Sequence, residues 1–262
     1  MFIDSHCHLD KLDLTPYAGD FAAMMRNTQR QGVKHILCIS IDLAAYPAMR
    51  ALAEPFPWVS FSLGVHPNVT DQTEPSLDEL VRLGEDPRVI AIGETGLDYF
   101  HGKGDLDWQR QRFIRHIEAA KILGRPLVIH TRDAGQDALD LLETHGAQAV
   151  GGIIHCFTED WSYAQRAMEL NFLISFSGIV TFKNAQIIQE VAKKIPAERF
   201  LIETDAPYLA PVPYRGKPNY PAYVKHVAEF IADLRETDVA SVARASSENF
   251  CRLFPSAAVT AG

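Results

Sequence analysis

The sequence predicts an α/β fold of the (β/α)8 type, also called a TIM barrel. The first observation is that eight short apolar segments recur along the 262 residues and alternate with helical segments. The second is that these segments are apolar throughout, as in parallel strands buried on both faces. The third is that polar clusters follow the segments, where a barrel of this type builds its active site. A doubly wound open sheet is the alternative.

Each predicted strand is a short apolar run bounded by polar residues, glycine or proline. The first begins at the N-terminus, and the others occupy residues 33–41, 58–65, 88–92, 126–129, 150–154, 172–176 and 199–202. The predicted helices occupy residues 19–31, 43–53, 76–83, 107–123, a segment ending at residue 145, 161–170, 183–195, 220–234 and 239–253.

Local signals support the helix assignments. Ser76, with Glu79 three residues later, forms the capping-box pattern that is typical of a helix N-terminus. In segment 107–123, apolar residues such as Phe113 recur at helical spacing, and Gly124 follows as a C-terminal cap.

Composition narrows the class of protein. No linker divides the chain, so residues 1–262 are predicted to form one domain. The apolar runs fall far short of the roughly 18 residues that a membrane span needs. Because no basic segment followed by an apolar one opens the sequence, we expect no signal peptide. The four cysteines form no CxxC pair, which is typical of a reducing compartment. We therefore expect a cytoplasmic monomer with no membrane segment and no obligate protein partner.

The N-terminal segment holds the first candidate ligands. His6 and His8 are two residues apart, so on a strand they point to the same face and Cys7 points to the other. Two imidazoles placed in this way can bind one metal ion. The alternative is a pair of histidines that are exposed or already hydrogen-bonded.

Further candidates follow other predicted strands. Five of the ten histidines fall at strand ends, and so do several carboxylates. These residues are His6, His8, His66, Glu94, His130, His155, Glu203 and Asp205. The carboxyl ends of the strands face one mouth of a barrel, so the sequence predicts a metal centre there. The other histidines are interpreted as ordinary: His35, His101, His116, His145 and His226.

The number of candidate ligands predicts two metal ions. A catalytic zinc ion typically takes three protein ligands, whereas six are available here: His6, His8, Glu94, His130, His155 and Asp205. Six ligands suit two ions that share a carboxylate, and Glu94 is the candidate bridge. Mixed nitrogen and oxygen ligands favour Zn, Mn, Fe or Co over an all-oxygen magnesium cage, without settling the metal.

Asp205 and Glu94 are the predicted catalytic residues. Asp205 can bind an ion and take a proton from the attacking water; the alternative is that it only caps a turn.

Three further residues have supporting roles. Glu203 can support a ligand or bind an additional ion. His66 can bind a third ion or the substrate, or only shape a His-Pro turn. Asp98 can orient a ligand.

Cationic and aromatic residues suggest the substrate. The net charge of −8 argues against a broad basic surface, but cations gathered in one cleft can bind phosphate. Arg132 and Arg215 are the candidates for this role, although Arg132 can instead pair with Asp133. The aromatic residues that could stack bases, or only pack at the rim, are Tyr99, Phe100, Phe157 and Tyr208.

Six motifs together make the sequence similar to a known family. They are DSHCHLD at residues 4–10, GVHP at 64–67, GETGLDY at 93–99, HTRDA at 130–134, HCFT at 155–158 and ETDAPY at 203–208. In order and spacing they resemble the TatD family of metal-dependent hydrolases, and its bacterial YcfH-type members above all.

The resemblance implies a TIM barrel of the amidohydrolase superfamily and a centre of two divalent cations (Zn, Mn or Mg). It also implies a deoxyribonuclease, often a 3′→5′ exonuclease on single-stranded DNA. It assigns metal binding to His6, His8, Glu94, His130, His155 and Asp205.

Two other functions stay open at this point. One is an amidohydrolase-like enzyme that opens a small amide, lactone or phosphoester with the same centre, because the barrel alone does not fix the chemistry. The other is a metal-stabilised scaffold without activity. The intact set of six candidate ligands argues against this second function.

Overall fold

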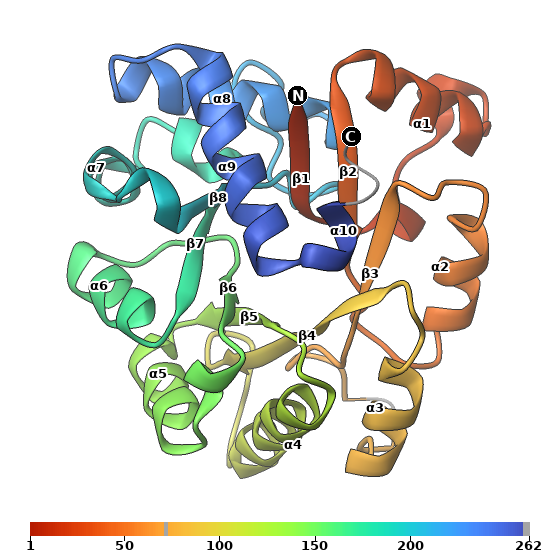
Figure 1. Cartoon of the computed structure of the whole chain (residues 1–262), viewed down its shortest axis with the longest axis vertical. Helices are drawn as coiled ribbons and strands as arrows, with labels where there is room; N and C mark the ends of the chain where they lie inside the picture. Colours follow the sequence, from red (N-terminus) through yellow and green to blue (C-terminus); the bar gives the residue numbers. More distant parts are fainter. Residues whose placement is uncertain (71–72, 259–262) are drawn as a thin grey trace.

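A barrel of eight parallel strands forms the centre of the computed structural model, which describes residues 1–70 and 73–258 (Figure 1). The strands pair in sequence order, and each is parallel to the next. They are β1 (Phe2–Cys7), β2 (Val33–Cys38), β3 (Val59–Leu63), β4 (Val89–Asp98), β5 (Leu127–Arg132), β6 (Gly152–Ile154), β7 (Phe172–Phe176) and β8 (Phe200–Ile202).

The barrel closes between its first and last strands. A parallel bridge joins Cys7 to Ala206, and the N–H of His8 donates to the Ala206 carbonyl at 2.8 Å. The strand order and this closure confirm the predicted TIM barrel and exclude the doubly wound sheet.

Helices surround the barrel (Figure 1). They are α1 (Phe21–Arg30), α2 (Tyr46–Leu52), α3 (Leu77–Gly84), α4 (Asp107–Leu123), α5 (Gly135–Thr144), α6 (Trp161–Glu169), α7 (Gln186–Lys194), α8 (Val224–Leu234), α9 (Val239–Leu253) and α10 (Pro255–Ala258). The side chain of Ser76 caps α3 by accepting from the N–H of Glu79 at 3.1 Å, as the capping box predicts. No helix among the described residues is long and apolar enough to cross a membrane.

Two apolar clusters form the core, and polar residues occupy one mouth of the barrel. The larger cluster packs the outer face of the strands against the helices. The smaller one fills the barrel interior, with Ile3, Leu37 and Val128 among its strand residues. Phe250 and Phe254, from the end of α9 and just beyond it, belong to the same interior cluster. In Figure 1, α9 and α10 accordingly lie across one end of the barrel. The polar residues in the carboxyl-terminal halves of β1, β4 and β5 include His6, Glu94 and His130.

Two strands, β4 and β5, extend further than the sequence predicts, whereas β2, β3, β6 and β8 are shorter than predicted. β4 continues to Asp98 instead of ending at residue 92, and β5 continues to Arg132 instead of residue 129. The helix predicted at residues 220–234 begins only at Val224, because Pro221–Tyr223 forms a separate 3-10 turn. The end of an apolar run marks where a strand leaves the core. Hydrogen bonding to the neighbouring strand nevertheless continues into the polar residues that follow. Glu94 and His130 therefore lie on strands, which fixes their backbones.

The close contact between β4 and β5 gives the first testable prediction. Gly96 is paired with His130, its φ is +138°, and an added Cβ would lie 2.0 Å from the His130 carbonyl oxygen. Gly96→Ala is therefore expected to lower the free energy of unfolding by about 2–5 kcal/mol, from backbone strain and overpacking together. Chemical denaturation measures this change.

A second glycine gives a matched control. Gly19 also has a positive φ, +79°, but an added Cβ there meets no atom within 4 Å. Gly19→Ala should therefore cost only the backbone strain, about 1 kcal/mol. Equal losses in the two variants would show that the contact between β4 and β5 is not what requires Gly96.

Candidate metal centre

Glu94 lies at the centre of a cluster of histidines at the mouth of the barrel. Its side chain is only 3% exposed. One carboxylate oxygen, Oε2, lies 3.4 Å from His6 Nε2 and 3.9 Å from His8 Nε2. The other oxygen faces three further imidazoles. The distances from Oε1 are 3.4 Å to His66 Nε2, 3.2 Å to His130 Nδ1 and 2.9 Å to His155 Nε2. The two oxygens of one carboxylate thus face two separate groups of imidazoles.

Asp205 lies beside the first of these groups. Its Oδ1 is 3.4 Å from His8 Nε2 and 3.6 Å from His6 Nε2. The Asp205 N–H donates to the His6 carbonyl at 2.9 Å, which fixes the backbone beside the ligand candidates. The neighbouring Thr204 is held by Asp4, whose carboxylate accepts from the Thr204 N–H at 2.9 Å and from its Oγ1 at 2.6 Å. Sequence reasoning missed this role of Asp4.

Unpartnered atoms indicate that the cluster fits a cation. His6 is fully buried, yet neither of its ring nitrogens has a hydrogen-bond partner among the described residues. The same holds for Glu203 Oε2, which is buried near His6 and His155. Buried polar atoms normally have partners, and a bound metal ion would supply one here. The candidate ligand atoms of His6, His8 and Asp205 lie within 4.8 Å of one another, and so do those of His66, Glu94 and His130.

Three of the histidines are oriented by a partner behind them. The ring nitrogen that does not face Glu94 is bonded as follows: His8 Nδ1 to the Ile39 carbonyl at 3.3 Å, His155 Nδ1 to Glu203 Oε1 at 3.2 Å, and His130 Nε2 to Asp98 Oδ2 at 3.3 Å. Each ring therefore donates an N–H away from the centre and turns its other nitrogen toward the centre of the cluster. This is the usual arrangement of metal-binding histidines.

His66 is oriented in the opposite way. Its Nδ1 accepts a hydrogen bond from the Asn68 N–H at 3.1 Å. In this tautomer the proton is on Nε2, which lies 3.4 Å from Glu94 Oε1. His66 is therefore arranged as a hydrogen-bond donor to Glu94 or to a ligand oxygen.

Asp98 is the centre of a second network, next to the first. Its Oδ2 lies 2.7 Å from Asn68 Nδ2, 2.9 Å from His101 Nδ1 and 3.3 Å from His130 Nε2. The side-chain carbonyl oxygen of Gln109 accepts a hydrogen bond from the Asp98 N–H at 3.1 Å. The interpretation of His101 as ordinary was wrong, because it lines the cleft and helps to fix Asp98. The sequence reasoning also missed Asn68, which has no distinctive motif.

The electrostatics of the cluster favour a cation at its centre. Burial opposes the ionisation of Glu94, but the interactions of its carboxylate with the surrounding imidazoles, that of His155 first, outweigh burial and hold the pKa of Glu94 well below its usual range. Burial also opposes the protonation of His155, yet Glu94 and Glu203 raise the pKa of His155 well above its usual range. Burial and the nearby His155 lower the pKa of His6, so that ring is neutral and can act as a ligand.

The cluster opens into a cleft of about 1020 Å³. Arg132 lines this cleft, and its guanidinium lies 4.1 Å from the centre of the Phe100 ring. Within residues 1–70 and 73–258, Arg132 makes no ion pair, so the predicted alternative of a pair with Asp133 is not formed. The structure does not bring Arg215 to the cleft wall; its guanidinium lies 4.2 Å from the centre of the Phe182 ring.

The four candidate aromatic residues differ in exposure. Phe100 and Tyr208 are 57% and 54% exposed. Tyr99 is held by a hydrogen bond from its hydroxyl to Asp137 at 2.7 Å, and Phe157 is buried in the core at 2% exposure. Only Phe100 and Tyr208 of the four are thus accessible enough to stack on a ligand.

Known proteins match the chain along almost its whole length. A family model described as "TatD related DNase" matches residues 3–255. The metal-dependent hydrolase YcfH of Escherichia coli, itself described as uncharacterized, is 43% identical over 96% of this chain and 95% of its own. YabD of Bacillus subtilis, with the same description, is 40% identical over 97% of this chain and 99% of its own.

A solved structure agrees with these sequence relatives. The crystal structure of YJJV, a TatD homologue from E. coli, superposes with a TM-score of 0.89 and 28% identity, covering 97% of this chain and 98% of its own. The family model and the two relatives extend over the whole barrel, including every strand that contributes to the cluster around Glu94. The chain therefore belongs to the TatD family of metal-dependent hydrolases.

Proposed function

We propose that this hydrolase is a phosphodiesterase that cleaves DNA from the 3′ end and uses two divalent cations, with Zn, Mn and Mg as the candidate ions. The observation that carries the proposal is the position of Glu94, whose two oxygens face two separate groups of imidazoles. The guanidinium of Arg132 has no acidic partner in the cleft, so it can bind the phosphate group of a phosphodiester. The description of the matching family as DNase supports the choice of substrate.

The residues divide into two ligand groups in this proposal. His6, His8 and Asp205 hold one cation, and His130 with His155 holds the other. Glu94 is shared between them. A pair of cations of this kind polarises a phosphoryl oxygen and lowers the pKa of water when bound. Glu203 then supports His155, and Asp98 supports His130, through the hydrogen bonds that fix their tautomers.

The remaining roles follow from the chemistry of the side chains. Asp205 accepts the proton of the attacking water, because its carboxylate is at the cleft and is ionised: His8, His6 and His155 lower its pKa despite burial. Arg132 binds a phosphate oxygen of the substrate. His66 donates from Nε2 to a substrate oxygen. Phe100 and Tyr208 are the accessible rings on which bases stack.

The polarity of cleavage is tested with labelled DNA. Single-stranded DNA carrying a label at its 5′ end is expected to give a ladder of successively shorter labelled products, whereas a 3′ label should be released at once as a mononucleotide. The opposite pattern would overturn the 3′ polarity. Hydrolysis of small amides, lactones or phosphoesters without any DNA cleavage would replace the proposal by the small-substrate function.

Arg132 provides a test of phosphate binding. Arg132→Ala is expected to raise KM for single-stranded DNA by about 10- to 150-fold, the equivalent of one charge-assisted hydrogen bond, and to lower kcat much less. Steady-state kinetics at several salt concentrations measures both constants. Arg215→Ala is the matched control, since Arg215 lies outside the cleft wall, and should leave KM within about twofold. An effect of Arg132→Ala on protein stability alone would show that the residue is structural.

A further inference from the structure

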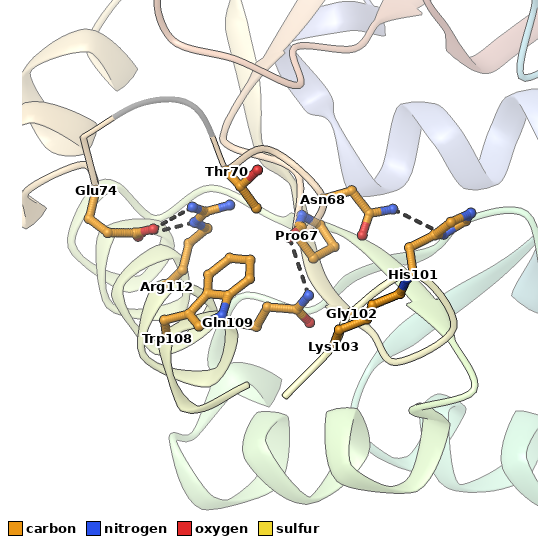
Figure 2. Close-up of a pocket in the computed structure, with 10 residues that line it drawn as sticks. All are labelled: Pro67, Asn68, Thr70, Glu74, His101, Gly102, Lys103, Trp108, Gln109 and Arg112. Atoms are coloured by element: carbon orange, nitrogen blue, oxygen red, sulfur yellow. Dashed lines mark hydrogen bonds and ion pairs between the residues drawn. The ribbon is translucent and has the colours of Figure 1, made fainter. Parts of the chain in front are cut away.

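A second cavity adjoins the catalytic cleft. It has a volume of about 560 Å³, which is within the range of roughly 300–1,000 Å³ for small-ligand sites. Its walls come from the segment after β3, the loop after β4 and the first two turns of α4 (Figure 2). Asn68 and His101 line both this cavity and the cleft, so the two spaces share a wall. We call the second cavity the side cavity.

The indole of Trp108 lines the side cavity and is held in place. Figure 2 shows the Trp108 ring beside the guanidinium of Arg112, which lies 4.8 Å from the ring centre. Arg112 is itself fixed by an ion pair with Glu74 and by hydrogen bonds to the carbonyls of His66 and Val69, both at 2.8 Å. Trp108 is half-buried and, among the described residues, belongs to neither apolar cluster of the barrel. An aromatic surface is therefore preorganised in this cavity.

The charges around the side cavity leave one cation for a ligand. The charge of Arg112 is neutralised by Glu74. Lys103, by contrast, is exposed and makes no ion pair with any residue in the described ranges 1–70 and 73–258. Hydrogen-bonding groups are also present in the wall, on Asn68 and His101. An indole, polar side chains and a free ammonium group together suit a ligand that consists of a flat ring system and a phosphate.

We propose that the side cavity is a nucleotide subsite, in which a base next to the scissile phosphodiester stacks on Trp108 and its phosphate lies near Lys103. The inference rests on the proposed function, because a neighbouring base exists only in a nucleic acid substrate. Stacking on an indole is tolerant of sequence, so the subsite strengthens binding of the strand without selecting one base.

Fluorescence tests the subsite without any cleavage. Titration with 2′-deoxyadenosine 5′-monophosphate, which has no phosphodiester bond, is expected to quench tryptophan fluorescence to saturation. The quenching should be lost in Trp108→Phe and kept in Trp161→Phe, because Trp161 is another half-buried tryptophan but lines neither cavity. Absence of quenching in the unmodified protein, or quenching that persists in Trp108→Phe, would overturn the proposal.

Kinetics tests whether the subsite serves catalysis. In Trp108→Ala, kcat/KM for octathymidylate is expected to fall about 5- to 150-fold relative to kcat/KM for bis(4-nitrophenyl) phosphate, which carries no nucleobase. Trp108→Phe, which keeps a stacking ring, should restore most of the loss. Lys103→Ala should reduce the salt dependence of oligonucleotide binding.

The outcomes separate this inference from the proposed function. An equal fall of kcat/KM for both substrates in Trp108→Ala would overturn the subsite, because it would show a structural role for the indole. Saturable quenching at Trp108 without any cleavage of DNA by the unmodified enzyme would support the subsite as a nucleotide site and overturn the proposed nuclease activity.

Discussion

Asp205→Asn is expected to lower kcat for DNA cleavage by about 10²- to 10⁴-fold, the range for the loss of a general base. The substitution removes a negative charge and a proton acceptor but keeps the shape of the side chain. Asp205 has a φ of +55°, a conformation that asparagine adopts as readily as aspartate, so the barrel should stay intact. Single-turnover kinetics, with circular dichroism and metal analysis of the same samples, measures the effect.

Asp133 provides the matched control for Asp205. It also has a positive φ, +53°, and lines the same cleft, but it is in none of the groups that could hold a metal ion among the described residues. Asp133→Asn should therefore change kcat by less than about threefold. Turnover of Asp205→Asn close to that of the unmodified enzyme, at unchanged metal content, would remove Asp205 from its assigned role.

Glu94→Gln is expected to have the largest effect of any single substitution. It removes the one carboxylate that lies between both groups of imidazoles, so the bound cations should fall from two to one or none per chain. If the two cations contribute several kcal/mol to the transition state, kcat falls by about 10³-fold or more. Elemental analysis and steady-state kinetics measure the two quantities on one preparation.

An exposed glutamate gives the control for this variant. Glu118 is on the outer face of α4, and Glu118→Gln should leave both metal content and kcat unchanged within error. If Glu94→Gln kept two cations per chain and lost less than tenfold in kcat, Glu94 would not be a shared ligand. The two ligand groups would then have to bind their ions independently.

The sequence predicted the barrel because its strands obey a simple rule. Strands buried on both faces are apolar runs, and residues that follow them collect at one mouth. The same rule placed His6, His66, His155 and Glu203 at one mouth. In the structure the three histidines lie around Glu94, and Glu203 contacts His155. The rule set the ends of β4 and β5 too early, since hydrogen bonding to a neighbouring strand does not depend on side-chain polarity.

Residues on loops were predicted less well. Arg215 was expected in the cleft because it follows β8, but the proline-rich loop carries it onto Phe182 instead. His101 and Asn68 were not recognised, since their role depends on two loops that meet only in the folded chain at Asp98. Sequence position determines where a strand ends, whereas the path of a loop depends on tertiary packing.

We propose that a pair of cations around Glu94 drives the cleavage of DNA. The most direct measurement is a titration of metal-free enzyme with Mn²⁺, in which bound ions per chain and cleavage of 5′-labelled single-stranded DNA are followed together. We predict that cleavage stays low with the first ion and rises steeply as the second ion binds. Full activity at one ion per chain, or no cleavage of DNA with two ions bound, would contradict the account.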